Sequence, residues 1–234
     1  MRATGSGAGC GSHWPLCNGE VIPRTHQAET LIEFTHRLSS ALALLLVAGL
    51  FLWVWRIYPR RHPVRLGAFF SLLFLITEAL VGAVLVLFAW VAQDASIGRV
   101  ISIAVHLINT FLLLASISLT AWWSSGGKAV RLKGGGGKVW VFVVGLAGVL
   151  FIGITGAITA LGDTLYPSTS LVEGLRQDFS GTGYILLRLR IWHPIIAVLV
   201  TFYIGFIALW ELSSSSDLWV RKFSALLGGF LSSS

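Results

Sequence analysis

Three histidines lie at similar positions in three long apolar segments of the chain: His36, His106 and His193. Each follows the expected outer end of its segment by about 6–10 residues, which is roughly 9–15 Å along a helix. Imidazoles are costly in hydrocarbon, so they usually face the interior of a helical bundle and have a role there. Histidines that face one another across a bundle commonly hold a haem iron. The alternative for any one of them is a hydrogen bond between helices.

An acidic residue accompanies the first histidine. Glu33 precedes His36 by three positions, so the two share a helix face. A carboxylate beneath the membrane surface is costly unless it is used, and we therefore expect Glu33 to act in catalysis. The alternative is a structural ion pair with Arg37, which follows Glu33 at the i,i+4 spacing.

Arginines lie close to the other expected haem ligand. Arg188 and Arg190 precede His193, and Pro194 follows it, where it can kink the helix and turn the histidine inward. Arginine binds carboxylates through two parallel hydrogen bonds, so Arg188, Arg190 and Arg37 are possible partners for haem propionates. The alternative is that these side chains only reach toward the membrane surface.

Cys10 and Cys17 are the only two cysteines. In an oxidising compartment we expect them to form a disulfide, which is either structural or exchanges with a thiol-disulfide partner. His13 lies between them, but two cysteines and one histidine offer only three ligands to a metal ion.

The composition predicts a multi-pass membrane protein. The 234 residues are 55% hydrophobic and 12% charged, unlike an ordinary soluble domain. The net charge of +7 comes from basic residues gathered in short loops, where they set membrane orientation, and we expect no nucleic-acid binding. A membrane span needs about 20 apolar residues. Five segments qualify, namely 31–57, 67–92, 98–123, 139–161 and 184–210. A sixth apolar segment, at 218–231, is too short to cross the membrane.

The charges of the loops predict an orientation in the plasma membrane. The loops after the first and third segments are strongly basic, so both should be cytoplasmic. The cysteine pair and the three histidines then lie toward the outer side. We accordingly divide the chain into an outer segment (1–30), first-half helices (31–123), a cytoplasmic linker (124–138) and second-half helices (139–234).

Several motifs resemble the haem A synthase family. The matching stretches are Arg2-Ala3-Thr4-Gly5-Ser6-Gly7, Cys10, Trp14 to Gly19, Glu33-Phe34-Thr35-His36-Arg37, His106-Leu107, Gly156-Ala157, Gly162-Asp163-Thr164 and Arg190 to Pro194. The resemblance implies an all-α polytopic bundle of two pseudo-repeated four-helix halves. Compared with that pattern the chain looks truncated at both ends, and we expect a further apolar helix to be encoded before Met1.

The resemblance also implies a reaction. His36 and His106 would bind the substrate haem O, and Glu33 would be the carboxylate needed there. His193 would be one ligand of a haem b. The product would be haem A, formed by oxidising a methyl group to a formyl group for cytochrome oxidase assembly. Haem O synthase would be the supplier. The electron donor is not identified by the sequence, and a homo-oligomer is compatible with it.

Two other functions are consistent with parts of the sequence. A bis-histidine cytochrome b that only transfers electrons explains the histidines equally well, but not the neighbouring Glu33 or the cysteine pair. A transporter with a histidine proton relay is less well supported, because no pair of broken helices is evident at the midplane.

Overall fold

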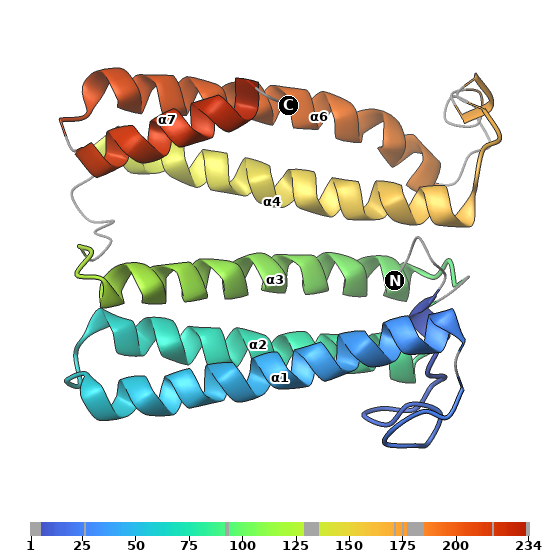
Figure 1. Cartoon of the computed structure of the whole chain (residues 1–234). Helices are drawn as coiled ribbons and strands as arrows, with labels where there is room; N and C mark the ends of the chain where they lie inside the picture. Colours follow the sequence, from blue (N-terminus) through green and yellow to red (C-terminus); the bar gives the residue numbers. More distant parts are fainter. Residues whose placement is uncertain are drawn as a thin grey trace. The chain divides into compact units, whose positions relative to one another are not determined.

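The computed structural model describes residues 6–25, 27–91, 94–128, 136–170, 172–174, 176, 185–216 and 218–232. Over these residues the chain forms helices and loops without a strand, and five of the helices are long and apolar enough to cross a membrane (Figure 1). The all-α polytopic fold is thereby confirmed. The helices are η1 (Ser6–Ala8), α1 (Ala28–Ile57), α2 (Pro63–Leu87), α3 (Ile97–Ser124), α4 (Gly136–Leu165), α6 (Ile185–Ser214) and α7 (Leu218–Ser232).

The five spanning helices coincide with the five predicted segments, and the differences lie at their ends. The second segment was predicted to continue to residue 92, but α2 ends at Leu87. The chain turns there because Ala89 adopts a left-handed conformation, with φ of 54°, which a helix does not contain. α4 extends to Leu165, beyond the predicted residue 161. α7 has 15 residues and is not among the candidate spans, in agreement with the short sixth segment.

Side-chain caps fix where α2 and α3 begin. The His62 side chain accepts a hydrogen bond from the amide of Val64, and Pro63 occupies the first position of α2. The Ser96 hydroxyl accepts a hydrogen bond from the amide of Arg99 at the start of α3. Such caps satisfy backbone donors that a helix leaves unpaired. They set the register of each helix and hence the depth of the side chains that follow.

The chain divides into two compact units, which are described separately below. The first comprises Met1–Ala129 with Ala160–Ser168, and the second comprises Val130–Thr159 with Thr169–Ser234. The first boundary falls within the segment predicted as a linker, residues 124–138.

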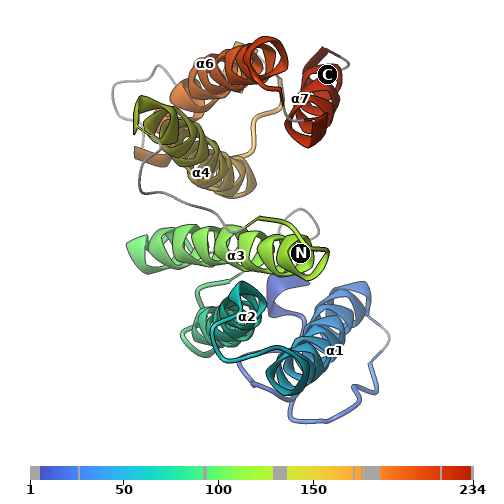
Figure 2. The same ribbon diagram turned by 90° about the vertical axis from the view of Figure 1, so that its left-hand side faces the viewer.

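In the first unit α2 packs against both α1 and α3 (Figure 2). Gly67 permits the close approach of α3, because a Cβ atom there would lie 2.4 Å from the Thr120 hydroxyl. Large side chains such as Leu45 and Leu46 on α1 are instead 71% and 65% exposed. Lipid is as apolar as leucine, so membrane helices associate through small and polar residues. The buried polar residues of α2 and α3 include Ser71, Ser102, Asn109, Ser116 and Thr120.

In the second unit two polar contacts connect α4 to α6. The Tyr203 hydroxyl donates a hydrogen bond to the carbonyl of Val141. Lys138 Nζ lies 2.8 Å from Glu211 Oε1, and Glu211 is only 4% exposed. A buried carboxylate needs such a partner because it has left water. α7 packs against α6.

Candidate functional site

A disulfide closes a small loop that packs against the start of α1. Cys10 and Cys17 are joined with an S–S distance of 2.02 Å, and the two residues are 0% and 1% exposed. We call residues 10–17 the cysteine loop. The amide of Asn18 donates to the carbonyl of Cys10, and Cys17 exchanges backbone hydrogen bonds with Glu20. A solvent-borne reagent can therefore reach the sulfurs only if the loop moves.

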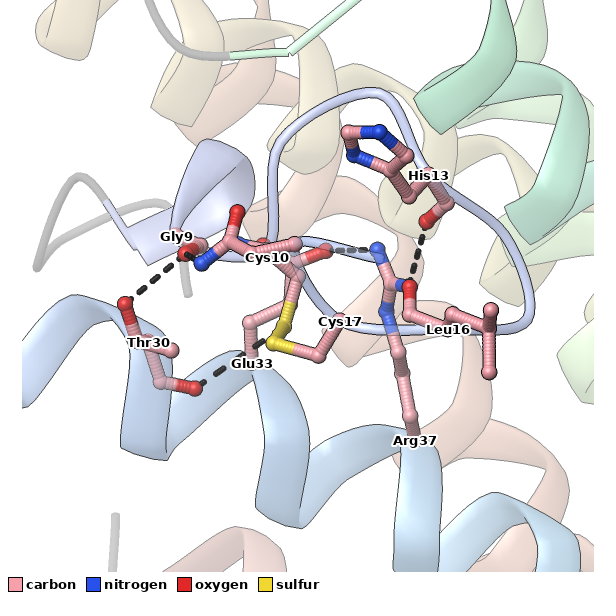
Figure 3. Close-up of polar contacts among 9 residues, drawn as sticks. Gly9, Cys10, His13, Leu16, Cys17, Thr30, Glu33 and Arg37 are labelled. Atoms are coloured by element: carbon pink, nitrogen blue, oxygen red, sulfur yellow. Dashed lines mark hydrogen bonds and ion pairs between the residues drawn. A yellow bond between two sulfur atoms is a disulfide. The ribbon is translucent and has the colours of Figure 1, made fainter. Parts of the chain in front are cut away.

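One face of α1 binds this loop through three side chains: Thr30, Glu33 and Arg37 (Figure 3). The Thr30 hydroxyl donates to the carbonyl of Gly9 over 2.8 Å. The amide of Cys10 donates to Glu33 Oε2 over 2.8 Å. A Cβ atom on Gly9 would lie 2.3 Å from the carbonyl oxygen of Glu29, so only glycine fits there. The loop and α1 thus form one packed structure.

Arg37 completes the contact from one helical turn further along. Its guanidinium pairs with Glu33 Oε1 at 2.5 Å and donates to the carbonyl oxygens of His13 and Leu16, each at 2.6 Å. The ion pair offered above as the alternative to a catalytic Glu33 is therefore present. The contacts of Arg37 with the loop had no signal in the sequence, and they leave it fewer donors for a haem propionate.

Glu33 and His36 have different surroundings despite their spacing. Glu33 is 1% exposed beneath the cysteine loop, whereas His36 is exposed. His36 lies about 12 Å from the start of α1 and His106 about 14 Å from the start of α3, at 1.5 Å per residue. Both helices begin at the same end of the first unit (Figure 1). Both histidines therefore lie at similar depths in helices of the first unit.

A carboxylate that the sequence analysis overlooked faces His106. Glu78 of α2 places Oε1 3.3 Å from His106 Nδ1. This distance is within the range of an ion pair, although the ring nitrogen is not aligned for a hydrogen bond. Glu78 Oε2 accepts from the Asn109 amide over 2.5 Å, and Oε1 accepts from the Thr110 hydroxyl over 2.5 Å. The signal was available, because Glu78 is an ionisable residue inside an apolar span.

An apolar groove lies beside this cluster, between α2 and α3. Its volume is 190 Å³, and it is lined by Leu80, Val81, Val84, Ile101, Ser102 and Val105. The lining residues are neighbours of Glu78 on α2 and of His106 on α3. Ser102 is the one polar residue of this lining.

The third histidine belongs to the second unit. His193 Nδ1 lies 3.1 Å from the Thr155 hydroxyl of α4. Its ring packs on Gly156, where a Cβ atom would lie 2.9 Å from His193 Cε1. Arg190, one turn earlier on α6, is 9% exposed. The side chain of Arg188 lies outside the described residues.

The donor atoms fit a haem better than a bare metal ion. Among the residues that the structure describes, no three His, Cys, Asp or Glu side chains are grouped to hold a metal ion. A haem needs only axial ligands, because the porphyrin supplies the other four. His106 and His193 each direct Nδ1 at an oxygen of a neighbouring helix, which leaves Nε2 as the nitrogen available to iron.

These features define a multi-pass membrane protein with two imidazoles at similar depths in helices of the first unit. Its sequence belongs to the COX15-CtaA family, described as cytochrome oxidase assembly protein, whose model matches residues 1–232. The family expected from the motifs is confirmed.

Two groups of relatives match the chain. A protoheme IX farnesyltransferase of Thermus thermophilus is 54% identical over 206 residues, which are 88% of this chain and 34% of that protein. Heme A synthases of Bacillus mycoides and Bacillus cereus are 39% identical over 119 residues, which are 51% of this chain and 36% of theirs. The chain thus spans about a third of the length of these curated relatives. No solved structure matches it.

Proposed function

We propose that the protein takes part in making haem A, by oxidising a methyl group of haem O to a formyl group. The observation that carries this proposal is that His36 of α1 and His106 of α3 lie at similar depths in one unit, about 12 and 14 Å from the helix starts at 1.5 Å per residue. Membership of a cytochrome oxidase assembly family supports it, as does the match to heme A synthases. The apolar groove beside His106 suits the isoprenoid chain that distinguishes haem O from haem b.

The residues of the chain have separate roles in this proposal. His36 and His106 hold haem O as substrate through its iron. His193 holds a haem b, which supplies one-electron redox chemistry when bound. Gly156 leaves room for the His193 ring, and the Thr155 hydroxyl sets its orientation. Buried Arg190, with Arg188, remains a proposed propionate partner.

Glu33 has two proposed roles. The resemblance assigns its carboxylate to the reaction at the first site, whereas its contacts assign it to holding the cysteine loop. The two roles are compatible if the loop covers the site during the reaction, and they predict different behaviour of a Glu33→Gln variant.

The farnesyltransferase name is not carried over as an activity of this chain. About two thirds of the Thermus protein lie outside the match, and 51% of this chain also matches heme A synthases. A farnesyltransferase acting on protoheme IX makes the substrate proposed here. We therefore propose a haem O synthase as the supplier, acting before this protein.

We place the protein in the plasma membrane with the cysteine loop and the histidines toward the outer side. Basic loops on the opposite side support this orientation. A thiol-disulfide partner could then reach the loop from outside. The electron donor and the possible homo-oligomer are left open by the proposal.

The test is haem analysis in a host that makes haem O but not haem A. The protein is expressed from its complete reading frame, and the haems are extracted and separated by chromatography. Haem A should appear, and His36→Ala or His106→Ala should abolish it. Protein that binds haem with unchanged haem O would instead favour the alternative, a bis-histidine cytochrome b that only transfers electrons.

A further inference from the structure

Glu78 is an ionisable residue within a spanning helix of the first unit that the proposed function does not use. Glu78 lies about 14 Å from the end of α2, at 1.5 Å per residue. This end adjoins the start of α3, so Glu78 and His106 are at matching depths (Figure 1). An ionisable residue at this depth is costly and usually has a function.

Two consecutive residues of α3 bind the two oxygens of the carboxylate. Thr110 binds Oε1 and Asn109 binds Oε2. Asn109 is itself fixed, because its amide also donates to the carbonyl of Phe74 and its oxygen accepts from the Thr77 hydroxyl. These contacts determine which way the amide of Asn109 points. Glu78 is therefore a positioned group rather than a freely rotating side chain.

We propose that Glu78 is a positioning residue for His106, which holds the Nδ1 side of the ring and so presents Nε2 to a haem iron. The inference rests on the proposed function, in which His106 is an iron ligand. Histidines that bind metals usually donate their second ring N–H to a carboxylate or carbonyl, which fixes the tautomer and raises ligand basicity. The 3.3 Å contact needs only a ring rotation to become such a hydrogen bond, and the His χ2 torsion is broad.

The second unit offers a contrast at the same ring atom. His193 Nδ1 faces the neutral hydroxyl of Thr155, whereas His106 Nδ1 faces a carboxylate. A carboxylate makes the imidazole a stronger donor and stabilises ferric over ferrous iron. Glu78 therefore lowers the reduction potential of haem at the first site, and the hydroxyl has no comparable effect at the second.

The experiment measures the first site alone. The protein is produced from its complete reading frame with His193→Ala, purified in detergent and saturated with iron protoporphyrin IX. The midpoint potential is measured by optical titration, and the low-spin ferric signal by electron paramagnetic resonance. Four variants are made in this His193→Ala parent and compared with it: Glu78→Gln, Glu78→Asp, Ser71→Ala and His106→Ala.

Glu78→Gln keeps the shape but not the charge, so the potential should shift upward and the g values should change. Glu78→Asp withdraws the carboxylate from the ring by one methylene and should give a smaller upward shift. Ser71→Ala removes a buried hydroxyl of α2 that donates to Gly67 and should leave both readouts unchanged. If the Glu78→Gln protein does not accumulate, the shift in midpoint potential of Glu78→Asp tests the positioning role.

Two negative results have different meanings. If His106→Ala removes the low-spin signal while both Glu78 variants behave like the parent, the positioning role is refuted and the proposed function survives. If His106→Ala itself leaves the signal unchanged, His106 is not a ligand, and both the proposed function at this site and the role of Glu78 are overturned.

Discussion

Replacing Glu33 with glutamine should loosen the cysteine loop. Glutamine retains an oxygen that can accept a hydrogen bond from the Cys10 amide. It cannot form the ion pair that Glu33, whose side chain is almost fully buried, makes with Arg37. A hydrogen bond to a charged group contributes about 1.5–3 kcal/mol. Every 1.4 kcal/mol is about tenfold in an equilibrium constant. The population in which the loop has opened should therefore rise about 10- to 100-fold.

The rate of disulfide reduction measures this opening. The sulfurs of Cys10 and Cys17 are buried, so a small phosphine reductant attacks only the open loop. When opening and closing are fast, the rate follows the open population. The protein in detergent is mixed with reductant, quenched with an alkylating reagent at intervals and analysed by mass spectrometry.

The same segment provides a matched control. Glu20 also pairs with an arginine at the i,i+4 spacing, but Arg24 and Glu20 have side chains that are 91% and 41% exposed. Exposed pairs contribute little, so Glu20→Gln should leave the reduction rate within about twofold of the parent. If the disulfide of the Glu33→Gln protein is reduced no faster than that of Glu20→Gln, Glu33 does not hold the cysteine loop closed.

The result also separates the two roles proposed for Glu33. Unchanged reduction with lost haem A formation would assign the carboxylate to the reaction. Fast reduction with normal haem A formation would assign it to the loop alone.

Three further results are expected. Gly156→Ala should displace the His193 ring, because the added Cβ would lie 2.9 Å from Cε1. The haem b content, measured by the pyridine haemochrome assay, should therefore fall severalfold. A normal haem b content would contradict the packing of His193 on Gly156. Lys138→Met should lower the thermal unfolding temperature by leaving Glu211 buried without its partner. The cost should stay below the about 3–5 kcal/mol of a fully buried pair, because the Lys138 side chain is 48% exposed. Adding Glu211→Gln should recover most of the loss, and no recovery would mean that the pair is not the cause. A membrane-impermeant maleimide, applied to intact cells after reduction, should label the cysteine loop, and labelling only after lysis would reverse the proposed orientation.

The spanning helices were predictable because their signal is local. Apolar stretches of sufficient length must be helical in a membrane, since each backbone group needs a partner within its own segment. The ends were less predictable. α2 stops at Leu87 because Ala89 turns the chain, although residues 88–92 are nearly as apolar as those before them.

The histidines and Glu78 carry the same kind of signal, since each is a polar group in an apolar span. Glu78 was not predicted as a site residue, because a carboxylate is not among the usual ligands of a haem iron. The contacts of Glu33 with Cys10 and of Arg37 with the loop carbonyls had no signal of this kind. They depend on how a glycine-rich loop folds back over α1, and this arrangement is a property of tertiary packing.

The position of Glu78 has a consequence for how the protein is made. A charged residue near the centre of a helix adds about 2.5–3.5 kcal/mol to the cost of its transfer from the translocon into lipid. With Glu78 counted, α2 still has a mean hydropathy of 2.4 over its most apolar window, so it remains a candidate span that carries one costly carboxylate. The groups that hold Glu78, on Asn109 and Thr110, belong to the next helix to be synthesised. During biosynthesis α2 should therefore stay beside the translocon until α3 arrives, and the two should enter the bilayer as a hairpin.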